Sequence, residues 1–412
     1  MNILKAILAF AALALVSAHP LDQSAASALQ AVAKGTQDFT IALHQVFRED
    51  ASSNMITSPL SLEVVLGMIA QGAKGTTKTQ LQQSLYLPTD DDVAKTGFRQ
   101  LLAPLKSNGN ITLDLADAAF LALDFQLDST FQKVASDDFK ASTTNVDFAG
   151  DTSGSVDTVN KWVEDHTNGK ITNLVPGMAV VSIQLTGVQL IYANLNPSTK
   201  LVLVNAVYFK GLWDVKFNSS LTKKAPFYVD SKTTLETDLM NAYSKFGYAE
   251  SDELGAKLLE LKYKGGDAKL VIILPNDKDG LADLESKLTN LNQVAIINER
   301  FVNVTIPKFK IEQTIKYTEI LKKLGITQVF SSLADLSGMS VTDNLYLDEV
   351  IQKSYIEVNE EGSEAASSTE TDIPSSIFEH PVDFVADHQF LFVLQDVKTN
   401  AVIFFGRYLT PD

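Results

Sequence analysis

Few stretches of this sequence place reactive residue types at a spacing that could do chemistry. GDTSGS, residues 150–155, is similar to the nucleophile motif of serine proteases, but Thr152 stands where that motif has its attacking serine. GAKGTTKT, residues 72–79, has the residue types of a phosphate-binding loop without its spacing. The histidines lack metal-ligand spacing, and cysteine is absent, which excludes thiolate zinc sites and thiol catalysis. The sequence therefore predicts no enzyme activity, no metal site and no cofactor.

A different chemistry is offered by EEGSEAASSTETDIPSSIF, residues 360–378, which lies between two strand-like runs. Alternate positions of residues 363–372 differ in character. One set is small and uncharged, and the other carries all the charges: Ser363, Ala365, Ser367, Thr369 and Thr371 against Glu364, Ala366, Ser368, Glu370 and Asp372. Such a period of two is typical of a strand whose faces meet different environments. From the residues alone, a disordered linker and a strand without its sheet both remain open.

The elements around this stretch change in type along the chain. DFTIALHQVF, residues 38–47, has helical spacing of its apolar residues, and Ser58 to Ala73 predicts a core helix with Ser58 as N-cap. Strands are predicted later, at Lys200–Phe209, Ala268–Pro275 and Phe301–Ile311, with a final hairpin formed by FLFVLQD and AVIFFGRYL. Helices followed by strands predict the α+β class.

Sequence features and net charge limit where the protein is expected to act and which classes of partner it can bind. Residues 1–18 have the charged start, apolar run and small-residue end of a secretory signal peptide, so we expect residues 19–412 to form one exported domain. The sequons at Asn110, Asn218 and Asn303 fit a secreted, extracellular glycoprotein. A net charge of −16 argues against binding to nucleic acid, to an anionic membrane or to a polyanion such as heparin.

Seven stretches of the chain, taken in order, carry a family resemblance. They are NMITSPLSLEVVLGMIAQGAKGTT, NKWVEDHTNGKI, LVLVNAVYFKGLWDVKF, VTIPKFKIEQT, LKKLGITQVF with ADLSGMS, IEVNEEGSEAAS, and DHQFLFVLQD with FFGRYLTP. From about Asp38 to Pro411 the chain therefore resembles the serpin family, in its secreted, invertebrate type. The resemblance implies an α+β serpin fold of three β-sheets and about eight or nine helices. It also implies an exposed reactive-centre loop at about residues 360–385.

The resemblance further implies a suicide-substrate mechanism. A target protease attacks the loop and forms an acyl-enzyme, and the cleaved loop then inserts as a new strand into the main sheet. The partner is then an extracellular serine protease in a covalent complex with a monomeric inhibitor. The hinge that must enter the sheet comprises Glu360, Gly362, Ser363, Ala365, Ala366, Ser367 and Thr369. Its small residues favour an inhibitor, and the alternative is a non-inhibitory serpin that acts as a carrier, storage or signalling protein.

Family spacing places the reactive-site bond between Ser376 and Ile377 when it is counted from the hinge. Counting back from DHQF gives Phe378 instead, and Ser375 is the other alternative. Between Lys353 and Lys398 there is no Lys or Arg, so the loop offers no cation to a trypsin-like specificity pocket. We therefore expect an elastase-like or chymotrypsin-like target.

Other positions match family motifs outside the loop. Those at the opening of the main sheet and at the base of the loop are Ser58, Ser61, Asn205, Trp213, Gln352 and the expected ion pair Lys308–Glu360. Gln352 stands where many relatives have a histidine, so we expect no pH sensitivity from that side chain. Residues 177–193 form an apolar insert that relatives lack. A genuine insertion and a translated intron both remain open as explanations.

Overall fold

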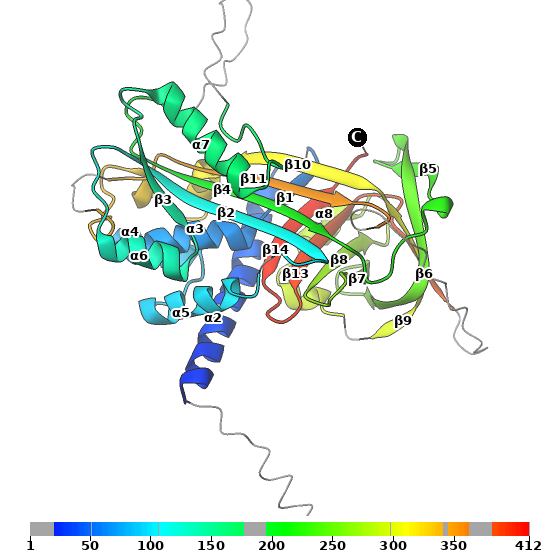
Figure 1. The fold of residues 1–412 in the computed structure, drawn as a ribbon. Helices are drawn as coiled ribbons and strands as arrows, with labels where there is room; N and C mark the ends of the chain where they lie inside the picture. Colours follow the sequence, from blue (N-terminus) through cyan, green and yellow to red (C-terminus); the bar gives the residue numbers. More distant parts are fainter. Residues whose placement is uncertain are drawn as a thin grey trace, which may run out of the picture.

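The computed structural model describes residues 20–50, 52–105, 107–176, 195–296, 298–340, 345–361 and 381–411 (Figure 1). The predicted signal peptide at 1–18, the insert at 177–193 and most of the predicted loop lie outside the described residues. No helix within the described ranges is long and apolar enough to span a membrane.

The described part of the chain contains eight α-helices, most of them in its first half. They are α2 (Pro20–Phe47), α3 (Pro59–Gly72), α4 (Gly75–Ser84), α5 (Asp91–Leu102), α6 (Ser129–Asp138), α7 (Thr152–His166), α8 (Leu281–Lys287) and α9 (Thr318–Lys323). Helix α3 is the predicted core helix. Ser58 caps it by accepting a hydrogen bond from the Ser61 N–H, Pro59 is its first residue, and nearly all of its side chains are buried.

The stretch GDTSGS begins α7. The Asp151 carboxylate accepts a hydrogen bond from the Gly154 N–H at 2.8 Å, as an N-cap residue does. The likeness of this motif to a protease nucleophile therefore has a structural explanation, because the same residue types favour the start of a helix.

A five-stranded sheet crosses the molecule with α7 on its outer side and α3 beneath it (Figure 1). Its strand order is β10 (Phe309–Lys316), β11 (Glu349–Val358), β4 (Leu201–Gly211), β2 (Ile111–Ala122) and β3 (Ser142–Val146). The predicted strand at Lys200–Phe209 is β4, and it is buried on both faces. Strands β11 and β4 pair in parallel through eight consecutive residue pairs, from Glu349 with Val202 to Ile356 with Phe209.

The other described strands form a nine-stranded sheet. They are β1 (Met55–Thr57), β14 (Val402–Tyr408), β13 (Phe390–Asp396), β8 (Ala268–Pro275), β7 (Ala256–Lys262), β6 (Thr234–Ser251), β9 (Glu299–Pro307) and β12 (Val382–Val385) in order, with β5 (Lys223–Tyr228) also pairing with β6. The family resemblance implies three sheets. Two of them are joined here because the long strand β6 pairs with β5 and β9 through its first part and with β7 through its last part.

The α+β class is confirmed, and so are the strand at Ala268–Pro275 and the final antiparallel hairpin. The prediction of one strand over Phe301–Ile311 is wrong. Strand β9 ends at Pro307, and β10 begins at Phe309 in the other sheet. Proline has no N–H to continue a ladder, and Lys308 carries the chain from one sheet to the other.

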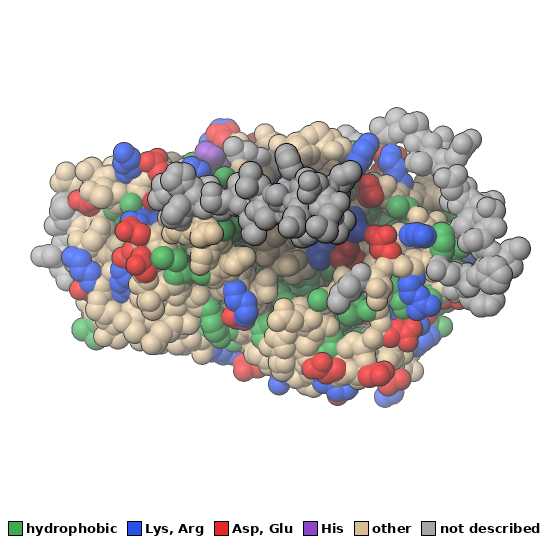
Figure 2. All heavy atoms as spheres, turned by 90° about the horizontal axis from the view of Figure 1, so that it is seen from below, with side chains coloured by type: hydrophobic (Ala, Val, Ile, Leu, Met, Phe, Trp, Pro, Cys, Tyr) green, Lys and Arg blue, Asp and Glu red, His purple; other side chains and the backbone are tan. Residues whose placement is uncertain are grey.

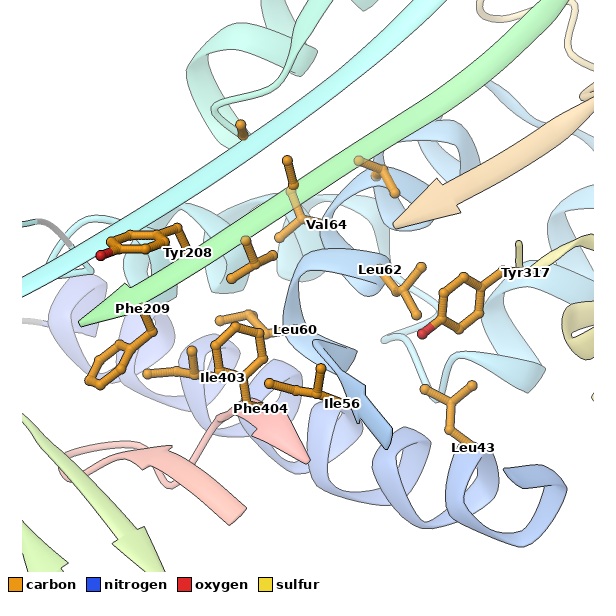
Figure 3. Packing of buried hydrophobic residues seen from close by; sticks show 14 of the residues in the cluster. Leu43, Ile56, Leu60, Leu62, Val64, Tyr208, Phe209, Tyr317, Ile403 and Phe404 are labelled. Atoms are coloured by element: carbon orange, nitrogen blue, oxygen red, sulfur yellow. The ribbon is translucent and has the colours of Figure 1, made fainter. Parts of the chain in front are cut away.

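The hydrophobic core lies between the two sheets. Figure 3 shows side chains from α2, β1, α3, β4, β14 and the start of α9 meeting there: Leu43, Ile56, Leu60, Leu62, Val64, Tyr208, Phe209, Tyr317, Ile403 and Phe404. A second cluster packs on the far face of the nine-stranded sheet, where α8 covers Leu258, Ile273 and Val393. Strand β14 contributes side chains to both clusters, whereas β4 contributes to the first.

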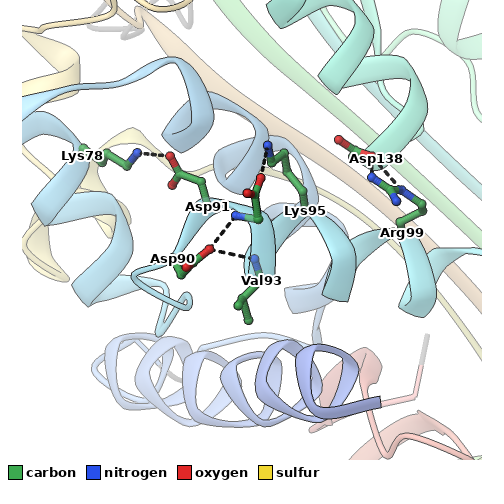
Figure 4. Close-up of polar contacts among 8 residues, drawn as sticks. Lys78, Asp90, Asp91, Val93, Lys95, Arg99 and Asp138 are labelled. Carbon is green, nitrogen blue, oxygen red and sulfur yellow. Dashed lines mark hydrogen bonds and ion pairs between the residues drawn. The ribbon is translucent and has the colours of Figure 1, made fainter. Parts of the chain in front are cut away.

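Polar contacts join the helices at one flank of the molecule (Figure 4). Asp90 caps α5 by accepting from the Asp92 and Val93 N–H groups. Lys78 of α4 reaches Asp91 at 2.5 Å, and Arg99 of α5 pairs with the buried Asp138 at the end of α6. On the face in Figure 2, positive and negative side chains are interspersed over the described surface.

Candidate functional site

The base of the predicted loop lies where β4 and β11 end. Three hydrogen bonds attach it to the segment that follows β4. The Trp213 N–H donates to the Glu361 carbonyl at 3.2 Å, the Phe217 N–H to the Glu360 carbonyl at 2.9 Å, and the Trp213 indole N–H to the Asn359 carbonyl at 2.8 Å. The chain therefore leaves the sheet directly above the seam between these two strands.

Glu360 is further held through its side chain. Its carboxylate accepts from Thr222 Oγ1 at 2.9 Å and pairs with Lys308 Nζ at 3.1 Å. Burial opposes ionisation, but hydrogen bonds from its own N–H, from Lys308 and from Thr222 together lower the pKa of Glu360. The structure thus brings together Lys308 and Glu360, the two residues that the family motif places at the loop base.

Trp213 forms a rigid aromatic platform under the loop base. Its ring stacks on Tyr263 with centroids 4.3 Å apart and meets Phe217 edge-on at 6.1 Å. Phe209, at the end of β4, packs against the other side of this group through Tyr263. Trp213 is 2% exposed, so its indole N–H has a fixed direction toward the Asn359 carbonyl.

The seam between β4 and β11 is closed along its length, since the two strands pair directly. A parallel ladder is slightly less stable per residue than an antiparallel one. A strand that turned back from Glu361 would run antiparallel to both neighbours, because both end at the loop base. Its entry would therefore replace one parallel ladder with two antiparallel ladders.

A buried polar cluster lies on the inner side of this seam. Gln352 of β11 donates from Nε2 to Asn205 Oδ1 of β4 at 2.8 Å and to the Ser58 carbonyl at 2.9 Å. Its Oε1 accepts from the Ser58 N–H at 2.7 Å. Ser61, one turn into α3, contacts Asn205 through a hydrogen bond with its Nδ2. The residues matched by motif at the sheet opening thus meet at one place.

Sequence reasoning missed four members of this cluster: Asp117, Thr57, Tyr317 and Ser354. The Ser354 hydroxyl donates to Gln352 Oε1 at 3.2 Å. Asp117 of β2 accepts from Ser61 Oγ at 2.7 Å and from Asn205 Nδ2. Tyr317 and Thr57 share a hydrogen bond of 2.6 Å, and both hydroxyls lie 3.2 Å from Gln352 Oε1. An acidic residue inside the apolar run LADAAFLA was the available signal for Asp117. Burial raises its pKa to about 7, against the lowering effect of the bonds from Ser61 and Asn205.

The reactive-site residues Ser375, Ser376, Ile377 and Phe378, and the hinge from Gly362 to Thr369, lie outside the described residues. Two of the three sequon asparagines, Asn218 and Asn303, are exposed, and Asn110 is half-buried. Asn218 Oδ1 accepts from the N–H and the hydroxyl of Ser220, whereas Asn303 Nδ2 donates to Asp383 at 3.1 Å. Within the described ranges, no group of three or more acidic or histidine side chains is arranged to hold a metal ion.

Comparisons with known proteins agree on one family. The family model described as "Serpin (serine protease inhibitor)" matches residues 34–411. Serpin B3 from Homo sapiens is 32% identical over 93% of this chain and 100% of its own length. The leukocyte elastase inhibitor of Bos taurus is 34% identical over 87% of this chain and 94% of its length. The crystal structure of Serpin48 from the insect Tenebrio molitor, 34% identical, has a TM-score of 0.81 and covers 93% of this chain and 99% of that one.

Proposed function

Because the chain belongs to the serpin family, which is described as a family of serine protease inhibitors, we propose that it traps a serine protease through its loop between Glu360 and β12. The observation that carries this proposal is the position of the loop base. It is tethered by hydrogen bonds above the closed parallel seam of β4 and β11, where a returning strand would improve the pairing on both sides.

The proposed reaction is the acylation step of serine-protease catalysis, without the hydrolysis of the acyl-enzyme that normally follows. The protease serine attacks the carbonyl carbon of Ser376 and forms an ester, while the bond to Ile377 breaks and the new amino terminus takes the proton. Residues from Gly362 onward then enter the seam beside β11 and carry the esterified protease away from its starting position. A dozen residues extend roughly 40 Å as a strand, which is enough to cross a sheet.

The composition of the loop and the name of one relative support an elastase-like or chymotrypsin-like target. The loop contains no Lys or Arg for a trypsin-like pocket, and small or apolar residues surround the proposed bond. One relative that is 34% identical is named as an inhibitor of leukocyte elastase. The acidic residues Glu360, Glu361, Glu364 and Glu370 further favour a protease with a basic rim around its active site.

The test is incubation with pancreatic elastase and with chymotrypsin, and with trypsin for contrast. We expect a band of summed mass that survives SDS, and a released peptide that begins at Ile377. Ala365→Arg should abolish the adduct but not the cleavage, because residue 365 belongs to the small, inward set of the loop. Glu364→Arg, on the charged set, is the matched control and should keep the adduct. Cleavage without an adduct in the unchanged protein would refute the proposal.

The insert at 177–193 favours one alternative, a non-inhibitory serpin. The described chain reaches it from Val175, whose backbone is fixed by two hydrogen bonds to Asn160 of α7, at 2.8 and 2.9 Å. Since α7 covers the sheet that the loop must enter, an apolar segment attached there could hinder insertion. Deletion of 177–193 separates the cases. An adduct that forms only after deletion identifies the insert as the obstacle, whereas cleavage without an adduct in both forms supports the non-inhibitory function.

We also propose that the protein is secreted as a monomeric glycoprotein. The motif at residues 1–18 supports export, and the exposed sequon asparagines Asn218 and Asn303 fit a glycoprotein. Expression in a eukaryotic secretory line should release a protein whose first residue is His19 and which elutes as a monomer. Retention of the protein in the cell with Met1 intact would contradict this proposal.

A further inference from the structure

Three buried polar side chains form a line across three adjacent strands. Asp117 of β2 is the register partner of Asn205 of β4, and Asn205 is the register partner of Gln352 of β11. Each is hydrogen-bonded to the next, through Asn205 Nδ2 to Asp117 and through Gln352 Nε2 to Asn205 Oδ1 at 2.8 Å. None of the three is more than 4% exposed. The line therefore connects a buried acid to the seam that a returning loop must open.

The second bond of this line crosses the seam itself. Separation of β4 from β11 must break the contact between Asn205 and Gln352, since these residues lie on opposite sides of the gap. Gln352 is also held by both backbone groups of Ser58 at the start of α3. Asp117 is attached to the same helix through Ser61 Oγ at 2.7 Å. Opening the seam therefore disturbs the whole polar surroundings of Asp117.

We propose that Asp117 makes the opening of this seam depend on pH: in its neutral form it holds the sheet closed in mild acid, and in its ionised form it eases opening at neutral and higher pH. The inference rests on the proposed function, because it concerns the sheet that the loop would enter. A neutral carboxyl keeps a carbonyl oxygen that accepts from Asn205 and Ser61. An ionised one keeps the same bonds but places a net charge in the core without a counter-ion.

Other ionisable groups on the surrounding elements do not supply that counter-ion. They are Glu63 on α3, Tyr317 before α9, Glu349 and Lys353 on β11, Asp114 on β2 and Arg407 on β14. Lys353 pairs with Glu312 at 2.9 Å, and Arg407 pairs with Glu285 at 3.0 Å. Glu349 accepts from Thr318, and Asp114 accepts from Asn168. The pKa of Asp117 is accordingly affected by burial and by two neutral hydrogen-bond donors, with no contribution from a charged neighbour.

The direction of the effect follows from linkage. Burial raises the pKa of Asp117 from 3.8 to about 7 in the closed sheet, so the closed sheet binds the proton more tightly than an opened, hydrated one. The stabilisation of the closed sheet by the protonated Asp117 carboxyl is complete below the ordinary pKa of an aspartate, 3.8, and it is lost as the pH rises through about 7. Each unit by which opening lowers this pKa corresponds to a change of about tenfold in the opening equilibrium.

The first test measures uptake of a synthetic peptide with the sequence of residues 363–374 by the intact protein, between pH 5.5 and pH 8. We expect the uptake rate to rise with pH and to level off above about pH 7. Asp117→Asn should remove this dependence. Glu63→Gln is the matched control, because it also removes a buried acid, which belongs to α3 but lies on the side that faces α2, and it should keep the unmodified profile. A profile that Asp117→Asn leaves unchanged, or a rate that falls with pH, would overturn the inference.

The second test needs neither uptake nor a variant. Hydrogen exchange of the backbone amides that pair across the seam, such as that of Asn205, corrected for intrinsic rates, reports opening of the seam directly. Protection of these amides should fall at least severalfold between pH 5.5 and pH 7.5. Equal protection at both pH values counts against the role of Asp117. Peptide that is not taken up at any pH, together with pH-dependent exchange, would instead count against loop insertion and leave the seam inference standing.

Discussion

At the scale of single residues, the contact between Lys308 and Glu360 is a tether rather than a source of stability. Lys308 is half exposed and Glu360 is mostly covered, and such a pair adds only about 0–1 kcal/mol. We expect Lys308→Met to change the free energy of unfolding by less than about 1 kcal/mol. Because the loop base loses a contact, the same change should speed the formation of the protease adduct. Denaturant unfolding and adduct kinetics measure the two effects separately.

Lys310→Met is the matched control for this prediction. Lys310 lies two residues further on, in β10, and pairs with Glu312 at 3.7 Å instead of with Glu360 at the loop base. It should have a similarly small effect on unfolding and none on the adduct rate. Equal adduct rates in both variants and the unchanged protein would contradict a tethering role for Lys308.

Glu63 provides a prediction about pH and stability. It is fully buried between α3 and α2, and burial raises its pKa well above 4.5 against the smaller lowering effect of the Thr36 hydroxyl. The folded protein therefore holds a proton here that the unfolded chain releases, and stability is lost as the pH rises above about 4.5. The free energy of unfolding of Glu63→Gln should thus increase with pH relative to that of the unchanged protein, by at most about 1.4 kcal/mol for each pH unit.

The measurement is denaturant unfolding of both proteins at several values between pH 5 and pH 7.5. The difference between the two free energies isolates Glu63, because all other titrating groups are common to both. Glu164→Gln on the exposed side of α7 should show no such trend. A constant difference across this range would mean that Glu63 is ionised in the folded protein.

At the scale of elements, the surroundings of each sequon decide where a glycan fits. Asn218 lies in an exposed turn before β5. Asn110 is half-buried in the loop before β2, where its amide nitrogen lies against Gly265. In secreted protein we therefore expect a glycan at Asn218 and none at Asn110. Glycopeptide mass spectrometry checks both sites, and Asn218→Gln should reduce the mass by one glycan while Asn110→Gln leaves it unchanged.

The elements also show what sequence patterns can and cannot predict. The helix beginning at Pro59 and the strand β4 were predictable because each is buried almost all round and carries its own local signal. Strands β9 and β10 were not separated, since VTIPKFKI alternates without a break although the chain changes sheets at Lys308. A pattern of period two reports exposure along one strand and carries no information about which sheet the strand joins.

The candidate site likewise contains residues that the sequence could predict and a residue that it could not. Gln352, Asn205 and Ser58 could be found because they lie inside motifs that the family shares. Asp117 was missed because its role depends on contacts with Ser61 and Asn205, which are 56 and 88 residues away in the chain. The expectation of no pH sensitivity concerned the Gln352 side chain alone and did not address a titrating group elsewhere in the cluster. Another strand supplies such a group, and the sequence of β11 alone could not reveal it.

At the scale of the whole molecule, the proposed mechanism predicts that cleavage makes the protein more stable. The seam of β4 and β11 is at present a single parallel ladder, and about ten inserted residues would add two antiparallel ladders. With net gains of roughly 1 kcal/mol per new hydrogen bond, the added stability is on the order of 10 kcal/mol. For a chain of this size, that raises Tm by roughly 10–20 °C. Calorimetry of intact and loop-cleaved protein measures this gain.

The variant Ala365→Arg again provides the comparison. Its loop is cleaved at the same bond, but a long cation at an inward position of the new strand would have to be buried against the closed core beneath the seam. The cleaved variant should therefore melt at the same temperature as its intact form, while the cleaved unchanged protein melts higher. If the unchanged protein also shows no gain, the metastable sheet proposed for it does not exist. The loop would then be an exposed segment of a non-inhibitory serpin.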